Sequence, residues 1–401
     1  MHNISRAAQK ADAQVQRASL SSGVPRSVLN SSRVLADLTP ALWQGCYNHR
    51  ESTMQQLAPY VGKMKSGIAN ALVVRCSEPG DTVFDPFAGS GVVPYEALTC
   101  GRHVIANDLS PYAQVVTAGK LFGPATRAVA VAEARHYTEQ ATADAAVRLD
   151  AVPGWVRKFF HPRTLRETLA LVRRLRADER WFLLACTMGI LHHVRPGFLS
   201  YPASHLTPYL RLAKYPPQED PDMYAYRPVA PRLEAKVERA YRRAPSIDPT
   251  LRRVVMRENA MALSLPDESV DAIVSSPPYL GALDYARDNR LRLWFLGVED
   301  YRELEQELTS NERVYVEQMS ACVRELHRVL RAGRLCALVL GEVRRSDRIW
   351  DTSSIIAELA GEGGRFRVER IVDDEIPDIR RSRRRTRTTK HDRVLILRRL
   401  G

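Results

Sequence analysis

The segment Thr82-Val83-Phe84-Asp85-Pro86-Phe87-Ala88-Gly89-Ser90-Gly91 gives the strongest indication of the fold. It opens with β-branched and aromatic residues, which favour a strand, and continues into a turn of small residues. Val92 to Cys100 then predicts a helix, which tolerates Pro94 in its first turn. A strand that passes through a glycine-containing turn into a helix is the basic unit of an α/β sheet.

The same alternation continues along the chain. His103 to Ala106 reads as a second strand, which ends at Asn107-Asp108. Ser110 is a suitable N-cap, with Pro111 at the first helical position, and Tyr112 to Leu121 continues that helix. Two successive strand-helix units predict a parallel sheet.

A long segment with helical periodicity, residues 122–248, interrupts this alternation. Strand patterns then resume at Arg253–Met256, Val270–Val274, Leu335–Leu340, Phe366–Ile376 and Val394–Leu397, with an amphipathic helix over Glu312–Leu330. The whole pattern predicts an α/β fold with a doubly wound, mostly parallel sheet and a largely helical insertion. We expect the insertion at the carboxyl edge of the strands, where open α/β sheets bind their ligands.

Length and pattern together predict the domain organisation. Of the 401 residues, 1–37 are polar and Arg-dotted and read as a flexible N-terminal arm. The two parts of the α/β domain are then 38–121 and 249–401, on either side of the insertion. The N-terminus lacks the apolar core of a signal peptide and no stretch is long enough to span a bilayer, so the expected location is cytoplasmic.

The charge of the chain is unusual for a globular protein. Its net charge is +13, although its apolar content of 45% and charged content of 26% are ordinary. Such a basic excess favours a polyanionic partner, first nucleic acid and then an acidic membrane surface. The alternative is a proteome that is rich in arginine throughout.

Metal and disulfide chemistry are not predicted. The six cysteines contain no CxxC pair, which argues against a zinc site and against a disulfide framework. His192, His193 and His205 lack ligand spacing with cysteines or carboxylates, and a structural role suits them better.

The glycine-containing turn has the chemistry of a binding site. Gly89 and Gly91 allow a ligand to approach the backbone, but the third glycine of a dinucleotide fingerprint is missing. A ligand without phosphates therefore suits the turn. Asp108 ends the next strand, where its carboxylate could accept both hydroxyls of a ribose. A plain strand-to-helix turn is the alternative.

Asp85 to Gly91 and Asn107 to Ala113 resemble motifs I and II of the S-adenosylmethionine-dependent DNA amino-methyltransferases. The stretch from His49 to Met64 is similar to their motif X. The resemblance implies a seven-stranded methyltransferase sheet with S-adenosyl-L-methionine as cofactor and no metal. It implies that these residues bind the cofactor: Lys63, Asp85, Pro86, Phe87, Gly89, Gly91, Asp108 and Asn259, the last where the family often has an aspartate.

Ser276-Pro277-Pro278-Tyr279 resembles the catalytic motif IV of the same family. An exocyclic amine conjugated to its ring is a poor nucleophile. Hydrogen bonds from that amine to the Ser276 side chain and the Pro277 carbonyl would localise its lone pair on nitrogen. Pro277 and Pro278 would stiffen the turn, and Tyr279 would stack on the base. A proline-rich turn after a buried strand is the alternative.

A cluster of arginines from Arg380 to Arg387 lies between the last two predicted strands. We expect Arg383, Arg384 and Arg385 to contact phosphates beside the site, because Arg and Lys supply most sequence-independent affinity for nucleic acid. A solvated loop is the alternative.

The sequence thus predicts a cytoplasmic, nucleoid-associated, site-specific DNA methyltransferase that acts on a flipped base. By resemblance, serine at the first motif position favours N4 of cytosine over N6 of adenine. Residues 122–248 would select the target. An RNA amino-methyltransferase and an inactive nucleic-acid-binding protein of the same fold are the alternatives. The recognition sequence, a restriction partner and the oligomeric state stay open.

Overall fold

The computed structural model describes residues 35, 37–43, 51–144, 146–205, 207–279, 285–305, 311–345, 348–375 and 391–401. The chain divides into two compact units, Met1–Leu38 and Thr39–Gly401. Most of the first unit, including nearly all of the predicted N-terminal arm, lies outside the described residues. All elements described below belong to the second unit.

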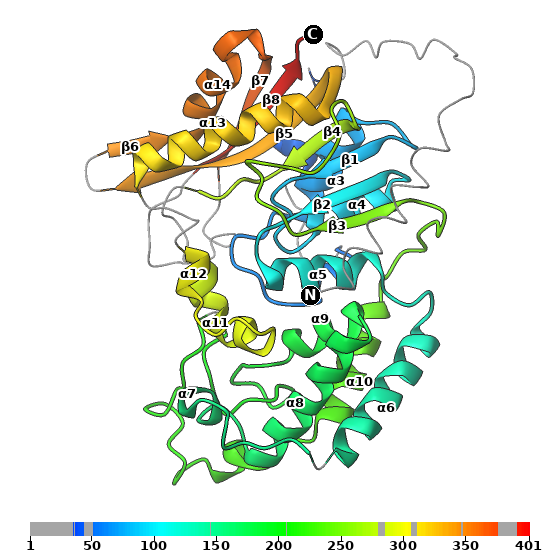
Figure 1. The fold of residues 1–401 in the computed structure, drawn as a ribbon, viewed down its shortest axis with the longest axis vertical. Helices are drawn as coiled ribbons and strands as arrows, with labels where there is room; N and C mark the ends of the chain where they lie inside the picture. Colours follow the sequence, from blue (N-terminus) through cyan, green and yellow to red (C-terminus); the bar gives the residue numbers. More distant parts are fainter. Residues whose placement is uncertain are drawn as a thin grey trace. The chain divides into compact units, whose positions relative to one another are not determined.

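One mixed sheet organises this unit (Figure 1). Its strands follow the order β3-β2-β1-β4-β5-β8-β7, and β6 pairs with β5 as an eighth strand. Their bounds are β1 Thr82–Asp85, β2 His103–Asn107, β3 Arg253–Met256, β4 Val270–Ser275, β5 Leu330–Arg345, β6 Arg348–Asp351, β7 Phe366–Glu375 and β8 His391–Arg399. Neighbours from β3 to β5 are parallel, whereas β8 runs antiparallel to β5 and β7.

This arrangement confirms the predicted mostly parallel sheet. The seven strands of the main path match the expected number, and β6 adds a strand that the sequence pattern did not indicate. Strands β1 and β4 are buried at every position, as expected for central strands covered on both faces.

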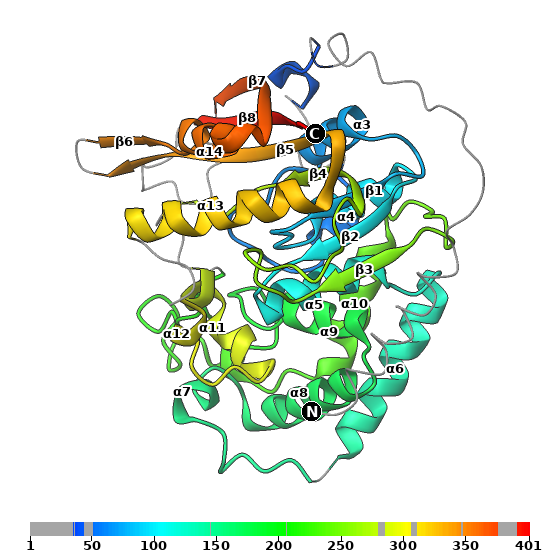
Figure 2. The same cartoon turned by 45° about the horizontal axis from the view of Figure 1, so that its top comes forward.

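Helices cover both faces of the sheet (Figures 1 and 2). On one face, α13 (Glu312–Val329) and α14 (Thr352–Gly361) pack on each other and on β5. On the other face lie α3 (Ser66–Cys76) and α4 (Val92–Thr99), with α5 (Pro111–Leu121) beside β3. The sheet is therefore doubly wound. The predicted cap is also present, because the Ser110 side chain accepts a hydrogen bond from the backbone N–H of Ala113.

The segment between β2 and β3 is helical, as its periodicity predicts. It contains α6 (Arg127–Ala143), α7 (Gly154–Arg157), α8 (Pro162–Ala177), α9 (Trp181–Gly189) and α10 (Val229–Tyr241). These helices pack against one another, and α9 joins the group to the sheet through α5 (Figure 2). The contact is close because Gly119 has no side chain: a Cβ there would lie 2.6 Å from the Cβ of Ala185.

The remaining elements are short or connect larger ones. After β4 come α11 (Tyr285–Phe295) and α12 (Arg302–Glu305), and the 3-10 helices are η1 Pro40–Leu42, η2 Thr53–Gln56, η3 Pro221–Tyr224 and η4 Glu362–Gly364. Across the described ranges, no helix is long and apolar enough to cross a membrane.

Candidate active site

The two sequence motifs meet at one edge of the sheet. Asp85 is the last residue of β1, Asp108 follows the end of β2, and Ser275 is the last residue of β4. Strand β1 lies between β2 and β4 and is parallel to both, so all three strands end at the same edge. The fold therefore places the predicted cofactor turn beside the Ser276–Tyr279 motif.

The turn after β1 needs its glycines. Gly89 and Gly91 have φ values of +52° and +71°, in the left-handed region that disfavours other residues. At Gly91 a Cβ would also lie 2.7 Å from the Thr117 hydroxyl, and at Gly89 it would lie 3.3 Å from the Tyr60 ring. The close approach of backbone that the sequence predicts is thus present.

Asp108 is held by two backbone amides. The N–H of Gly89 donates to one carboxylate oxygen at 2.8 Å, and the N–H of Ser110 donates to the other at 2.9 Å. Burial raises the pKa of Asp108 to about 6, and the two amides oppose that rise. The carboxylate is therefore fixed in orientation against the glycine turn.

Asp85 is linked directly to the second motif. The hydroxyl of Ser275 donates to Asp85 Oδ1 at 2.6 Å, and the N–H of Phe87 donates to the same oxygen at 3.2 Å. Burial raises the pKa of Asp85 to about 7, although both hydrogen bonds lower it. Asp85 thus joins the end of β4 to the turn after β1.

Asn107 is a structural clamp that the sequence reasoning missed. Its side-chain N–H group donates to the carbonyls of Pro86, at 3.2 Å, and Glu258, at 3.0 Å. Its side-chain oxygen accepts from the N–H of Glu258 at 2.8 Å. One buried amide therefore sets the spacing of three strand ends.

The neighbouring strand β5 and helix α13 hold the Ser276–Tyr279 motif. The Ser276 hydroxyl donates to the carbonyl of Val339 on β5 at 3.0 Å. The hydroxyl of Tyr315 on α13 donates to the Pro278 carbonyl at 3.1 Å. The Ser276 side chain also hydrogen-bonds with Tyr279, which opposes the rise of the Tyr279 pKa. A hydroxyl oxygen has two lone pairs, so Ser276 can accept a hydrogen bond while it donates to Val339.

Tyr279 lies on a glycine. A Cβ at Gly341 would lie 2.2 Å from the Tyr279 ring, so the ring occupies the space that any other residue would fill. The Tyr279 hydroxyl donates to Asp392 at 3.2 Å. Burial and the neighbouring Asp392 carboxylate raise the pKa of Tyr279 well above its usual value. The ring is therefore held by its packing against Gly341 and by the hydrogen bond from its hydroxyl to Asp392.

Phe87, Lys63 and Asn259 occupy different surroundings. Phe87 is half-buried and packs on the core cluster beside the turn. Lys63 donates to the carbonyl of Gln55 at 2.7 Å and pairs with Glu51 at 3.8 Å, and burial lowers its pKa. Asn259 is exposed, and its side-chain oxygen accepts from the N–H of Met261 at 3.0 Å. The structure places all three near the strand ends or the segment before α3.

Arg383, Arg384 and Arg385 lie outside the described residues. The flanking residues are described: Glu375 ends β7, His391 begins β8, and the two pair in register. Since β8 is antiparallel to β5, its first residues lie at the edge where β5 ends, and Asp392 contacts Tyr279 there. Glu375 and His391, the described residues on either side of the arginine-rich segment, therefore lie at the edge that carries the motifs.

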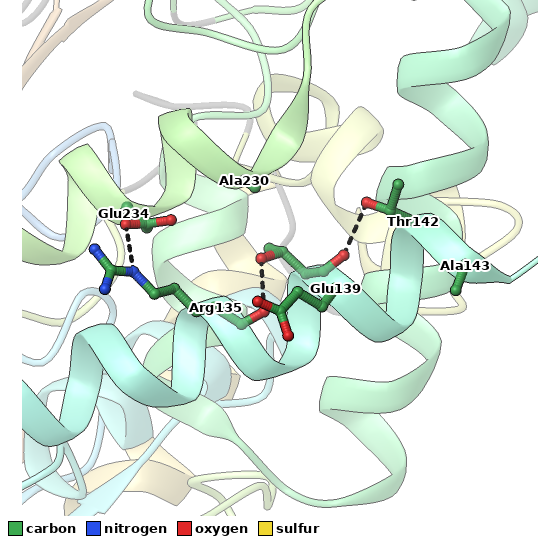
Figure 3. Close-up of a pocket in the computed structure, with 7 residues that line it drawn as sticks. Arg135, Glu139, Thr142, Ala143, Ala230 and Glu234 are labelled. Atoms are coloured by element: carbon green, nitrogen blue, oxygen red, sulfur yellow. Dashed lines mark hydrogen bonds and ion pairs between the residues drawn. The ribbon is translucent and has the colours of Figure 1, made fainter.

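A hollow of about 400 Å³ lies elsewhere, between α6 and α10 (Figure 3). Arg135 of α6 points toward Glu234 of α10, and their 2.9 Å ion pair is largely exposed. No strand end contributes to this hollow, which is distant in the fold from both motifs. In the part of the chain that the structure describes, no group of histidines, cysteines and carboxylates could hold a metal ion.

The strand-end residues suit a nucleoside ligand without phosphates. The Gly89 N–H, which would bind a phosphate in a dinucleotide site, already donates to Asp108. The Asp108 carboxylate would repel a phosphate but can accept hydrogen bonds from ribose hydroxyls. These features fit S-adenosylmethionine.

Comparison with known families supports this assignment. Residues 56–151 match the family model described as RMKL-like, methyltransferase domain. The matched segment contains the glycine turn and Asp108. Residues 56–151 are therefore similar to a methyltransferase domain. The strand order and helical layers of the chain form a Rossmann-like fold.

Three solved structures with some similarity are remote in sequence. TrmN from Thermus thermophilus is 12% identical, with a TM-score of 0.36; the match covers 86% of this chain and 52% of that chain, so this chain spans about half of TrmN. A putative RNA methyltransferase from Pyrococcus horikoshii is 9% identical over 86% and 89% of the two chains, with a TM-score of 0.34.

A putative DNA modification methylase, also from Thermus thermophilus and solved with S-adenosyl-L-methionine, is 20% identical over 34% of this chain and 49% of that chain, with a TM-score of 0.23. No curated protein matches the sequence of this chain.

Proposed function

We propose that the protein transfers a methyl group from S-adenosylmethionine to an exocyclic amine of a nucleobase in DNA. The observation that carries the proposal is the state of Ser276. Its hydroxyl proton is bound by Val339, so its oxygen can accept a hydrogen bond from an amine. The preceding residue, Ser275, is bonded to the cofactor turn through Asp85.

The residues of the chain bind and orient the two reactants. Asp108, held by the amides of Gly89 and Ser110, accepts hydrogen bonds from ribose hydroxyls. When bound, the cofactor supplies an electrophilic methyl group on a sulfonium. Ser276 and the Pro277 carbonyl would accept hydrogen bonds from the two N–H groups of the target amine and so orient its lone pair. As the nitrogen–carbon bond forms, the carbon–sulfur bond would break, the sulfur would leave as a thioether, and one amine proton would pass to solvent. Orientation of this kind lowers the barrier by fixing the reacting atoms in line.

Tyr279 provides a surface for the base. Gly341 covers one side of its ring, and Asp392 fixes its hydroxyl. A base that stacks on such a ring gains about 1–3 kcal/mol. A base in a duplex must leave the helix to reach it, and unstacking costs a few kcal/mol.

We propose that basic residues around the sheet edge that carries the two motifs bind the nucleic acid. The net charge of +13 favours nucleic acid. Arg383, Arg384 and Arg385 lie in the sequence between Glu375 and His391, which pair at the motif edge. We propose that these arginines contact phosphates. Residues 122–248 are proposed to select the target. Serine at the first motif position favours N4 of cytosine over N6 of adenine, by resemblance to the amino-methyltransferases.

The test is transfer of a labelled methyl group from S-adenosylmethionine to DNA and to RNA of matched sequence, followed by nucleoside analysis. Label in N4-methylcytosine from DNA is the expected result. Label in N6-methyladenine would correct the base, and label in RNA alone would correct the polymer. Label in neither polymer, together with intact nucleic-acid binding, would contradict the proposal and indicate an inactive binding protein.

A further inference from the structure

A column of three tyrosine rings and one guanidinium runs between the glycine turn after β1, which we call the cofactor turn, and α11. The guanidinium of Arg292 lies 5.4 Å from the centre of the Tyr112 ring. The Tyr112 and Tyr60 rings are stacked, with centres 5.9 Å apart and planes at 14°. The Tyr60 and Tyr285 rings are 6.4 Å apart at 35°.

The column draws its members from three separate segments. Tyr60 precedes α3, Tyr112 belongs to α5, and both Tyr285 and Arg292 belong to α11. Tyr285 and Arg292 are seven residues apart, so they lie on one side of the helix, two turns from each other. Helix α11 therefore supplies both ends of the column, and the two middle rings come from other segments.

The column also reaches the glycine turn. The Tyr60 ring lies where a Cβ at Gly89 would come within 3.3 Å of it. Residues on both sides of the Ser276–Tyr279 motif in sequence therefore contact the glycine turn or a residue packed on it. Ser275 bonds Asp85 before the motif, and Tyr285 contacts Tyr60 after it.

Burial of the Arg292 guanidinium is energetically unfavourable, and packing alone does not explain it. Its side chain is 1% exposed, and one of its terminal nitrogens has no hydrogen-bond partner. Its other nitrogens donate to the Met188 carbonyl and to Asn289, both at 3.2 Å. Among the described residues no carboxylate pairs with it. Burial of a charge without a counter-ion costs several kcal/mol, and an apolar residue of similar size is often no less stable.

We propose that this column is a positioning device, in which Tyr60 fixes α11 against the cofactor turn and so sets the place of the Ser276–Tyr279 motif relative to the cofactor. The inference rests on the proposed function, because it requires the turn to hold S-adenosylmethionine. Small errors in the alignment of reacting atoms are costly, since about 1 Å of misplacement lowers rates by about 10²-fold.

The test compares Tyr60→Leu, which removes the ring, with Tyr60→Phe, which keeps it. Amide hydrogen exchange is measured over α11 with and without S-adenosylmethionine. In the unaltered chain and in Tyr60→Phe, the cofactor should slow exchange in α11. In Tyr60→Leu this slowing should be lost, and kcat should fall at least about 10-fold while KM for nucleic acid stays within about 2-fold.

Arg292→Met should behave like Tyr60→Leu, with little loss in melting temperature. Arg102→Met is the matched control, because Arg102 is also buried but bonds Ser77 at the opposite edge of the sheet. It should lower the melting temperature and leave kcat unchanged.

Two outcomes would overturn the inference in different ways. If the unaltered chain binds no S-adenosylmethionine in calorimetry, the proposed function fails and this inference fails with it. If it binds the cofactor, but Tyr60→Leu shows the same protection of α11 and the same kcat, only the positioning role is wrong.

Discussion

Ser275 and Asp85 are 190 positions apart in sequence, yet the hydroxyl of one donates to the carboxylate of the other at 2.6 Å. This bond joins the ends of β4 and β1, which carry the two motifs. Both side chains are buried, so no bulk water competes for the bond. The relative position of the two motifs thus depends on a contact between neighbouring strands.

Ser275→Ala should therefore destabilise the protein. It leaves a buried carboxylate oxygen with one donor fewer, and such a loss costs about 1–3 kcal/mol of unfolding free energy. Chemical denaturation measures the effect. Ser269→Ala is the control, because the exposed Ser269 hydroxyl bonds only a loop carbonyl; it should cost less than about 0.5 kcal/mol. Equal losses in both variants would contradict the account.

Asp85→Asn should change how stability depends on pH. Burial raises the pKa of Asp85 to about 7 in the folded chain, against about 3.9 when unfolded. The folded state therefore binds the proton more tightly, and this contribution is complete below about pH 4 and is lost as the pH rises to about 7.

Asparagine does not titrate, so the variant should gain stability relative to the wild type between pH 5 and pH 8. The gain should be at most about 4 kcal/mol. Asp108 titrates in the same range and its negative charge contributes to the raised pKa of Asp85, so the difference between the two proteins includes this coupling. Unfolding free energies at the two pH values provide the measurement. A difference that does not vary with pH would show that Asp85 is not protonated near neutrality.

Gly341→Ala should lower methyl transfer by at least about 10-fold, because the new Cβ would overlap the Tyr279 ring and displace it. Steady-state kinetics on nucleic acid, at saturating cofactor, measure the change. Gly361→Ala is the control, since a Cβ there meets open space. Full activity in Gly341→Ala would mean that the place of the Tyr279 ring is unimportant.

Much of the fold could be predicted because its signals are local. The turn at Gly89 and Gly91 and the cap at Ser110 each depend on residues within a few positions of one another. The alternation of β-branched runs and helical periods gave the doubly wound sheet for the same reason. Strand β6 was missed because it is four residues long and pairs only with the far end of β5.

The internal contacts of the site could not be predicted, because they join distant segments. Nothing near Asn107 shows that its amide will bond Pro86 and Glu258. Position 341 requires a glycine because the Tyr279 ring, which follows a different strand, packs against it. The family resemblance predicted which residues form the site, and the packing shows how their side chains are held.

Asp108→Ala should weaken binding of S-adenosylmethionine. Hydrogen bonds to a charged acceptor contribute about 1.5–3 kcal/mol each. The loss of one or two such bonds to ribose hydroxyls would lower affinity by roughly 10- to 100-fold or more. Calorimetry measures the change. Asp300→Ala, at an exposed position beside Arg302, should bind as the wild type does. Unchanged affinity in Asp108→Ala would remove this residue from the cofactor site.

The central claim is that Ser276 holds the amine that receives the methyl group. Single-turnover transfer by Ser276→Ala, with cofactor affinity measured on the same preparation, tests it most directly. The account predicts cofactor binding within about 2-fold of the wild type and transfer to nucleic acid reduced by about 10²-fold or more, as when one positioned hydrogen-bond partner is removed from other active sites. Transfer at the wild-type rate would contradict it.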